Sequence, residues 1–178
     1  MPLINYGHLH FGENKIQEAI EKWTDIKKDF QEIKLHMIGK LQTNKVKFAI
    51  SLFDYIHSLD NLKLAEKISK EQVKQKKNLK IFIQINIGKE IQKSGISPDE
   101  LENFYKICKD KMSLNIIGIM CLPPKNLDEK KYFSEMLNLS KKINLPNLSM
   151  GMSGDYLNAL EYGSTFIRVG SKIFGERS

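Results

Sequence analysis

Two strand ends near the C-terminus carry the residue types that a phosphate group needs. Residues 148–155 read LSMGMSGD, and residues 165–171 read TFIRVGS. Each apolar run ends in small residues with a hydroxyl or a free backbone N–H: Ser153 in the first run, and Gly170 with Ser171 in the second. Each run then leads into a helical segment, and backbone N–H groups at a helix start bind anions. The sequence therefore predicts a phosphate-binding cup where these two strands end.

Arg168 lies between the two halves of this cup, in the second apolar run. Only two of the 28 basic residues are arginine, which indicates that this position needs a guanidinium. An arginine is always cationic and only donates hydrogen bonds, so inside an apolar strand it needs a partner. That partner is a ligand in one interpretation and a structural salt bridge in the other. Ser153 has a similar alternative, because it or Asp155 would cap the helix that follows.

The elements that position these residues alternate along the chain as apolar strand-like runs and segments with helical periodicity. Seven strands are predicted, at residues 8–11, 35–38, 55–57, 81–86, 116–120, 148–152 and 165–169. Apolar residues at helical spacing predict helices between them, as in the series Ile16, Ala19, Ile20 and Trp23. Strands that are apolar throughout and alternate with helices are typical of a parallel sheet covered by helices.

Two architectures compete for this pattern, an open doubly wound sheet and a (β/α)8 barrel. Regular spacing and the lack of a Gly-x-Gly-x-x-Gly fingerprint favour the barrel. A barrel has eight strands and typically more than about 200 residues, so seven strands in 178 residues fall one unit short. Residues 1–7 resemble the last turn of a helix with Gly7 as its cap. We therefore expect one domain over residues 1–178, a TIM-type barrel lacking its first strand and most of its first helix through N-terminal truncation. The alternative is a short N-terminal arm.

The composition of the chain argues against several classes of function. The net charge of +7 comes mostly from lysines interleaved with acids, without interleaved aromatic residues, which predicts solvated helix faces rather than nucleic-acid binding. No apolar run has the length of a membrane span and no signal-peptide pattern occurs, so we expect a cytoplasmic protein without a membrane partner. Cys108 and Cys121 lack metal-ligand spacing, which predicts no metal site and, for Cys108, a buried thiol. His36 and His57 are more typical of hydrogen-bonded core residues than of catalysts.

Seven motifs in order make the sequence closely resemble the pyridoxal-phosphate homeostasis protein family, whose fold matches the N-terminal barrel of alanine racemase. The motifs occupy residues 11–14 (FGEN), 36–45 (HMIGKLQTNK), 57–60 (HSLD), 84–86 (QIN), 93–95 (KSG), 148–153 (LSMGMS) and 168–175 (RVGSKIFG). Together they extend over essentially the whole chain. The resemblance implies that pyridoxal 5'-phosphate (PLP) lies across the barrel mouth.

The resemblance also implies roles for single residues. Ser153 and the backbone amides of Gly170 and Ser171 would hold the phosphate. Met152 would line the site, and Arg168 would face the pyridine nitrogen. An arginine there meets an unprotonated ring, which is a poorer electron sink than a ring paired with a carboxylate. The implied site therefore favours binding over demanding carbanion chemistry.

Two further positions are weighed against plainer roles. Asn44 would approach the cofactor, with helix capping as its alternative. Lys93 is a functional candidate that is otherwise a solvated loop lysine. Family members carry a Schiff-base lysine on the first barrel strand, in a Val-Ser-Lys-like motif, and no residue of this chain matches it. The resemblance therefore gives no catalytic residue here, and it predicts weaker, reversible PLP binding rather than covalent attachment.

The implied function is that of a PLP carrier or buffer in intracellular homeostasis, without turnover of its own and with PLP-dependent apoenzymes as recipients. One alternative is an amino-acid racemase, which needs an acid/base group on each face of its substrate. A second is a barrel enzyme for another phosphorylated metabolite. A third is an inactive fragment that lacks the Schiff-base lysine.

Overall fold

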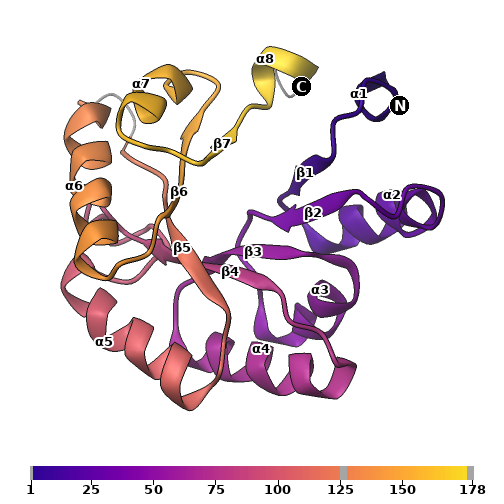
Figure 1. The fold of residues 1–178 in the computed structure, drawn as a ribbon, viewed down its shortest axis with the longest axis horizontal. Coiled ribbons are helices and arrows are strands. Elements are labelled where there is room, and N and C mark those ends of the chain that lie inside the picture. Colours follow the sequence, from indigo (N-terminus) through magenta and orange to yellow (C-terminus); the bar gives the residue numbers. More distant parts are fainter. Residues whose placement is uncertain (1, 125–127, 176–178) are drawn as a thin grey trace.

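The computed structural model describes residues 2–124 and 128–175 (Figure 1). Its strands are β1 (His10–Glu13), β2 (Lys34–Met37), β3 (Tyr55–Leu59), β4 (Lys80–Ile85), β5 (Ile116–Cys121), β6 (Asn147–Met152) and β7 (Phe166–Arg168). Its α-helices are α1 (Pro2–Asn5), α2 (Ile16–Asp29), α3 (Val46–Leu52), α4 (Leu62–Gln75), α5 (Leu101–Lys106), α6 (Glu129–Lys142), α7 (Tyr156–Glu161) and α8 (Ser171–Phe174). Two short 3-10 segments, η1 (Thr43–Lys45) and η2 (Pro98–Glu100), and a π-helical turn, η3 (Ile107–Lys111), complete the order.

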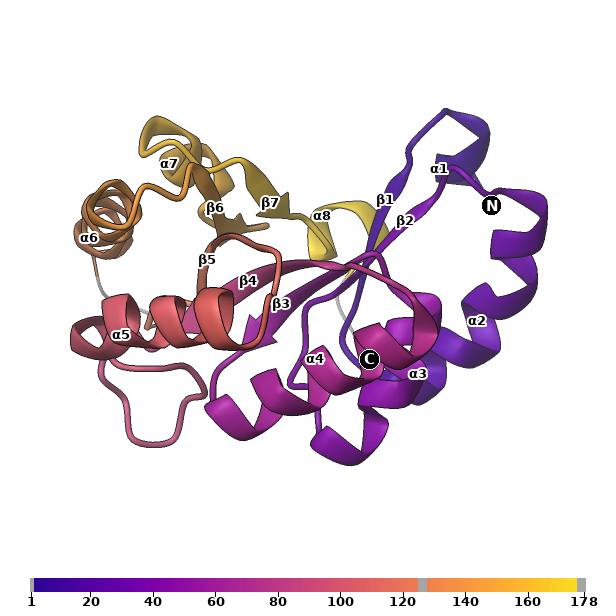
Figure 2. The ribbon, with the colours of Figure 1, turned by 60° about the horizontal axis from the view of Figure 1, so that its bottom comes forward.

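The seven strands form one parallel sheet in the order β1-β2-β3-β4-β5-β6-β7, so each strand pairs with its neighbour in the sequence. All seven predicted strands are confirmed, with bounds that differ by a few residues at most. Helices α2 to α7 form an arc around the outside of the curled sheet (Figure 1), and α8 lies near β1 in both views (Figures 1 and 2). Within the described residues the barrel is nearly closed, with seven strands and with β1 and β7 at its edges.

Side chains inside the curl show how far the sheet wraps. A small interior cluster contains Tyr55, Phe82 and Met120, packed against Phe166. The Phe166 ring on β7 lies 5.1 Å from the Phe82 ring on β4 and 5.8 Å from the Tyr55 ring on β3. Because these strands are well separated in the sheet, such contacts require a barrel rather than an open sheet. The expected TIM-type architecture is therefore confirmed.

The larger core fills the space between the strands and the helices. Alternate residues of β2 and β6, such as Leu35 and Met150, point outward into this core and are fully or almost fully buried. In α2, Ala19 and Trp23 lie on the face that packs against the strands, as the helical spacing predicts. Burial of such side chains stabilises the fold by about 1.5–3 kcal/mol each.

The N-terminal turn is also as expected for the residues that are described. Gly7 has a φ of 81° and donates its N–H to the carbonyl of Ile4 at 2.8 Å, so it ends α1 as a glycine cap. Met1 lies outside the described residues. In the part of the chain that the structure describes, no helix combines the length and the apolar character needed to cross a membrane.

Candidate functional site

The two predicted halves of the cup meet at the carboxyl ends of β6 and β7. The strands pair in parallel, with Met152 opposite Arg168. One residue beyond β6, the Ser153 hydroxyl oxygen accepts a hydrogen bond from the Gly170 N–H at 3.1 Å. A Cβ added to Gly170 would meet no heavy atom within 4 Å, so the space beside this backbone is open. The predicted proximity of Ser153 and Gly170 is therefore confirmed.

The start of α8 adds backbone donors to this cup. The first hydrogen bond of the helix runs from the Ile173 N–H to the Gly170 carbonyl at 2.9 Å. The N–H groups of Ser171 and Lys172 come before it, and no described residue accepts from them. Free N–H groups at such a position favour an anion. The Gly170 N–H, in contrast, is already taken up by Ser153.

The capping alternative for Ser153 is not what the structure shows. Asp155 is the residue that precedes α7, and its carboxylate accepts the Met152 N–H at 2.6 Å. This contact closes the turn between β6 and α7. The Ser153 hydroxyl instead bridges to the β7–α8 turn, so it belongs to the cup.

Arg168 is held by neutral partners. Its Nη1 donates to the Ser149 hydroxyl at 2.6 Å and its Nη2 donates to the Cys121 carbonyl at 2.8 Å. No carboxylate among residues 2–124 and 128–175 forms an ion pair with it, so the salt-bridge alternative is not supported. Burial lowers the pKa of Arg168, because desolvation disfavours the cation. The negative charge of Asp155 offsets part of this effect, and the guanidinium N–H groups that Ser149 and Cys121 do not use can donate to an acceptor ligand.

Ser149 is the site residue that sequence reasoning missed. It is fully buried, and its hydroxyl contacts both Arg168 and the Nδ1 of His57, the latter at 2.8 Å. A signal for it exists, because strand side chains alternate: Leu148 and Met150 pack in the outer core, so Ser149 between them faces the barrel interior. His36 and His57 are buried and hydrogen-bonded, which confirms the prediction that they are satisfied core histidines.

Asn44 lies at the same end of the sheet but in a different groove. It follows β2 in η1, is exposed, and lines a cavity of about 320 Å³ with residues of α4 such as Lys63 and Lys67. No described contact joins it to the β6–β7 cup. It is not a helix cap either, since α3 is preceded by Lys45, which makes no side-chain capping bond.

The lysines near this end of the barrel are spread out. Lys40 and Lys45 line a second cavity of about 300 Å³ beside the start of α2. The Lys172 ammonium lies 4.8 Å from the centre of the Tyr156 ring. These positions leave none of the three within a described contact of Ser153.

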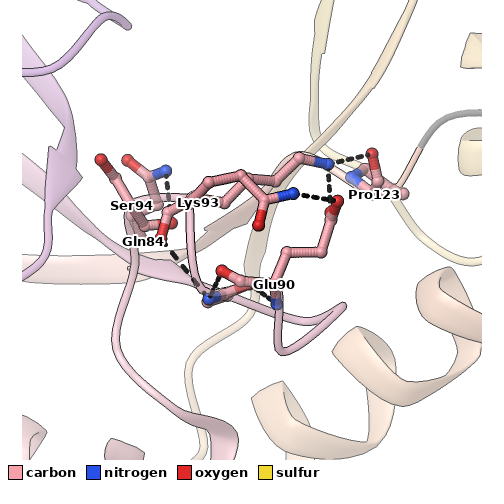
Figure 3. A network of polar contacts seen from close by, with 7 residues as sticks. Gln84, Glu90, Lys93, Ser94 and Pro123 are labelled. Carbon is pink, nitrogen blue, oxygen red and sulfur yellow. Dashed lines mark hydrogen bonds and ion pairs between the residues drawn. The ribbon is translucent and has the colours of Figure 1, made fainter.

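Lys93 has a structural role in the loop after β4 (Figure 3). Its ammonium forms an ion pair with Glu90 and donates to the Pro123 carbonyl at 3.3 Å. Nearby, the Gln84 side chain donates to the Ser94 carbonyl at 3.1 Å. These contacts tie the loop to β4 and to the segment after β5, so the motifs at residues 84–86 and 93–95 shape this loop. No three His, Cys, Asp or Glu side chains in the described ranges are grouped as metal ligands.

The fold and the cup together define an alanine racemase-like β/α barrel with a candidate anion site at the ends of its last two described strands. Sequence comparison agrees with this class. The family model for the alanine racemase N-terminal domain matches residues 1–178. A protein of Aquifex aeolicus named pyridoxal phosphate homeostasis protein is 35% identical over 97% of this chain and 79% of its own length. A protein of the same name from Synechocystis is 38% identical over 96% of this chain and 82% of its own.

Solved structures agree with this placement. PipY of Synechococcus elongatus, solved without PLP, is 32% identical and superposes with a TM-score of 0.92 over 98% of this chain and 85% of its own. The same protein with PLP bound superposes with a TM-score of 0.86. Alanine racemase of Clostridium difficile is 13% identical with a TM-score of 0.77, over 98% of this chain and 47% of its own, and shows the fold alone. The chain belongs to the alanine racemase N-terminal domain family and, within it, to the pyridoxal phosphate homeostasis proteins.

Proposed function

We propose that residues 1–178 form a PLP-binding domain that carries or buffers PLP in its homeostasis. The observation that carries this proposal is the pairing of Met152 with Arg168, which sets the Ser153–Gly170 cup beside the half-buried guanidinium of Arg168. Relatives that extend over almost the whole chain bear the name pyridoxal phosphate homeostasis protein, and PipY has been solved with PLP bound.

The donor set of the cup is suited to a phosphate. The Ser153 oxygen accepts from Gly170, so its own hydroxyl hydrogen is free to donate outward. The N–H groups of Ser171 and Lys172 are further donors without acceptors in the described residues. The one carboxylate close by in the chain, Asp155, is turned to the Met152 N–H. Three donors at an open backbone match the oxygens of a phosphate.

The donor set of Arg168 is suited to the acceptor nitrogen of a pyridine ring. A guanidinium cannot accept a proton, so it favours a ring nitrogen that stays unprotonated. PLP, when bound, supplies an aldehyde and a ring that withdraws electrons, and its ring does so less well without a proton on its nitrogen. The residues of this chain would therefore bind and orient the cofactor, which favours a carrier over a catalyst. Asn44 is proposed as a secondary contact at the other side of the barrel mouth.

The recipients that we propose are PLP-dependent apoenzymes, and the proposed compartment is the cytoplasm. Both cysteines are buried free thiols, which suits a reducing compartment. No lysine of this chain is assigned to an imine, so the proposed binding is noncovalent.

A comparison of PLP with pyridoxal tests the cup. Titration of the protein with each ligand, followed by absorbance, is expected to give tighter binding for PLP, because pyridoxal lacks the phosphate. Ser153→Ala should weaken PLP binding about 5- to 10-fold, as expected for one hydrogen bond of about 1 kcal/mol or slightly more, and leave pyridoxal unchanged. Ser51→Ala serves as a control, since its hydroxyl bonds to Phe48 on the remote helix α3. Equal affinity for the two ligands in the wild type would remove the phosphate cup from the proposal.

A further inference from the structure

A line of hydrogen-bonded side chains crosses the barrel interior from β1 to β7. The Nδ1 of His10 lies 2.9 Å from the Nε2 of His36, and the Nδ1 of His36 lies 2.9 Å from the Nε2 of His57. The Nδ1 of His57 lies 2.8 Å from the Ser149 hydroxyl, which also accepts from Arg168 at 2.6 Å. We call these five residues the relay. His10, at one end, is exposed, whereas His36, His57 and Ser149 are buried.

The direction of the relay follows from its last member. Arg168 only donates, so the Ser149 oxygen must accept from it. Ser149 then has one hydrogen left to donate, and its only other partner among the described residues is the Nδ1 of His57. A buried hydroxyl hydrogen without an acceptor costs about 1–3 kcal/mol. Ser149 therefore donates to His57.

The tautomers of the histidines follow from this hydrogen bond. A neutral imidazole that accepts at Nδ1 carries its hydrogen on Nε2. His57 therefore donates from Nε2 to the Nδ1 of His36, and His36 in turn donates from Nε2 to the Nδ1 of His10. Both buried rings are neutral at neutral pH, because burial lowers the pKa of His36 to about 3 and that of His57 well below its ordinary value.

We propose that the relay is a one-way chain of hydrogen bonds through His57, His36 and His10. Arg168 sets its direction through Ser149, and the chain in turn positions the guanidinium. The three histidines are thus positioning residues. Because the Ser149 hydrogen is committed to His57, a ligand beside Arg168 meets only the remaining donors of the guanidinium there. Where the proposed function holds, this arrangement selects ligands that present an acceptor atom to Arg168, such as an unprotonated pyridine nitrogen.

The tautomers of the buried histidines test the relay directly. In 15N-labelled protein of residues 1–178 without ligand, long-range 1H–15N NMR spectra distinguish a ring nitrogen that carries hydrogen from one that does not. The expected result at neutral pH is more than about nine-tenths of the Nε2–H form for both His36 and His57. A predominant Nδ1–H form in either ring would overturn the proposal.

Two variants locate the residue that sets the direction. Ser149→Ala separates Arg168 from His57, so the Nδ1–H form of His57 should rise at least several-fold. Ser140→Ala is a matched control, since Ser140 is also buried but bonds to Leu137 within α6, outside the relay. His10→Ala removes the exposed end and should leave both tautomers as in the wild type.

If Ser149→Ala leaves both tautomers as in the wild type and His10→Ala changes them, the direction is set from the His10 end. That result would overturn the proposal. If Ser149→Ala does not fold, the wild type and His10→Ala still decide, because a tautomer change in His10→Ala contradicts control by Arg168. All these spectra are recorded without ligand. Failure of PLP binding would therefore leave the relay standing, and failure of the relay would leave the phosphate cup standing.

Discussion

The guanidinium of Arg168 and the imidazole of His57 share one partner, the fully buried hydroxyl of Ser149. This shared contact joins β7 to β3 across the inside of the barrel, between residues that are more than a hundred positions apart. It places a cation next to a ring that must stay neutral, and the charge of Arg168 is one of the causes that lower the pKa of His57. The stability of the barrel and the electrostatics of the candidate site are therefore linked.

The first prediction concerns acid stability. The pKa of His36 is lowered from 6.5 to about 3, mainly by burial and then by His10. The unfolded chain binds a proton at this histidine below pH 6.5, whereas the folded chain does not, so stability is complete above 6.5 and falls as the pH drops towards 3. The slope is about 1.4 kcal/mol per pH unit for each such histidine, or about 2 kcal/mol for His36 alone by about pH 5. Urea unfolding at a series of pH values measures this slope.

A variant separates this effect from general acid sensitivity. His36→Gln should lower the stability at neutral pH and reduce the slope between pH 6.5 and 5 by one proton, whereas Ser140→Ala, a buried change that removes no titratable group, should keep the wild-type slope. An unchanged slope in His36→Gln would mean that His36 takes up its proton over the same pH range in the folded and in the unfolded chain.

The second prediction concerns the pyridine half of the site. Arg168→Ala removes the donors that we assign to the ring nitrogen, so PLP and pyridoxal should both lose affinity, by about 10- to 100-fold, the range expected for a hydrogen bond to a charged group. Ser153→Ala should weaken PLP alone. A PLP analogue with carbon in place of the ring nitrogen should bind the wild type about as weakly as PLP binds Arg168→Ala. Loss of PLP affinity with pyridoxal affinity intact would instead move Arg168 to the phosphate.

Some of the contacts behind these predictions could be predicted from the sequence, and others could not. The proximity of Ser153 and Gly170 was predictable, because the carboxyl ends of neighbouring parallel strands meet at one edge of the sheet. The partners of Arg168 were not, because its contact with Cys121 depends on strand register and that of Ser149 with His57 depends on how far the sheet curls. Local sequence patterns predict neither the strand register nor the curl of the sheet.

Asn44 shows the limit of a family motif. The motif at residues 36–45 places it at the correct end of the barrel, but not in a particular groove. The structure sets it against α4, next to Lys63 and Lys67, because η1 turns the chain towards that helix. Which groove a strand-end residue enters depends on the path of the loop, and a short polar loop carries little signal for its path.

The third prediction tests whether Asn44 still reaches the cofactor from there. If it contributes one neutral hydrogen bond, Asn44→Ala should weaken PLP binding about 2- to 10-fold, corresponding to about 0.5–1.5 kcal/mol. Thr43→Val, a change beside it in the same groove, serves as the control and should leave the affinity as in the wild type. Equal affinities for wild type and Asn44→Ala would remove this residue from the site and leave the cup with Arg168.

The fourth prediction concerns the two thiols. Burial raises the pKa of Cys108 and of Cys121 to about 12, and for Cys121 the nearby charge of Arg168 offsets only part of this effect. At about pH 8 only about one thiol in ten thousand is then a thiolate, the form that reacts with disulfide reagents. The native protein should therefore react negligibly with Ellman's reagent over an hour, and two thiols should appear at once in denaturant. Ser51→Cys, at an exposed position on α3, supplies a thiol that reacts within minutes in the folded protein and so verifies the assay.

Rapid reaction of one native thiol in the wild type would show that the barrel opens at Cys108 or Cys121, and labelling followed by peptide mass analysis would say which. Opening at Cys121 would also break the carbonyl contact that holds Arg168, so PLP at saturating concentration should then slow the labelling.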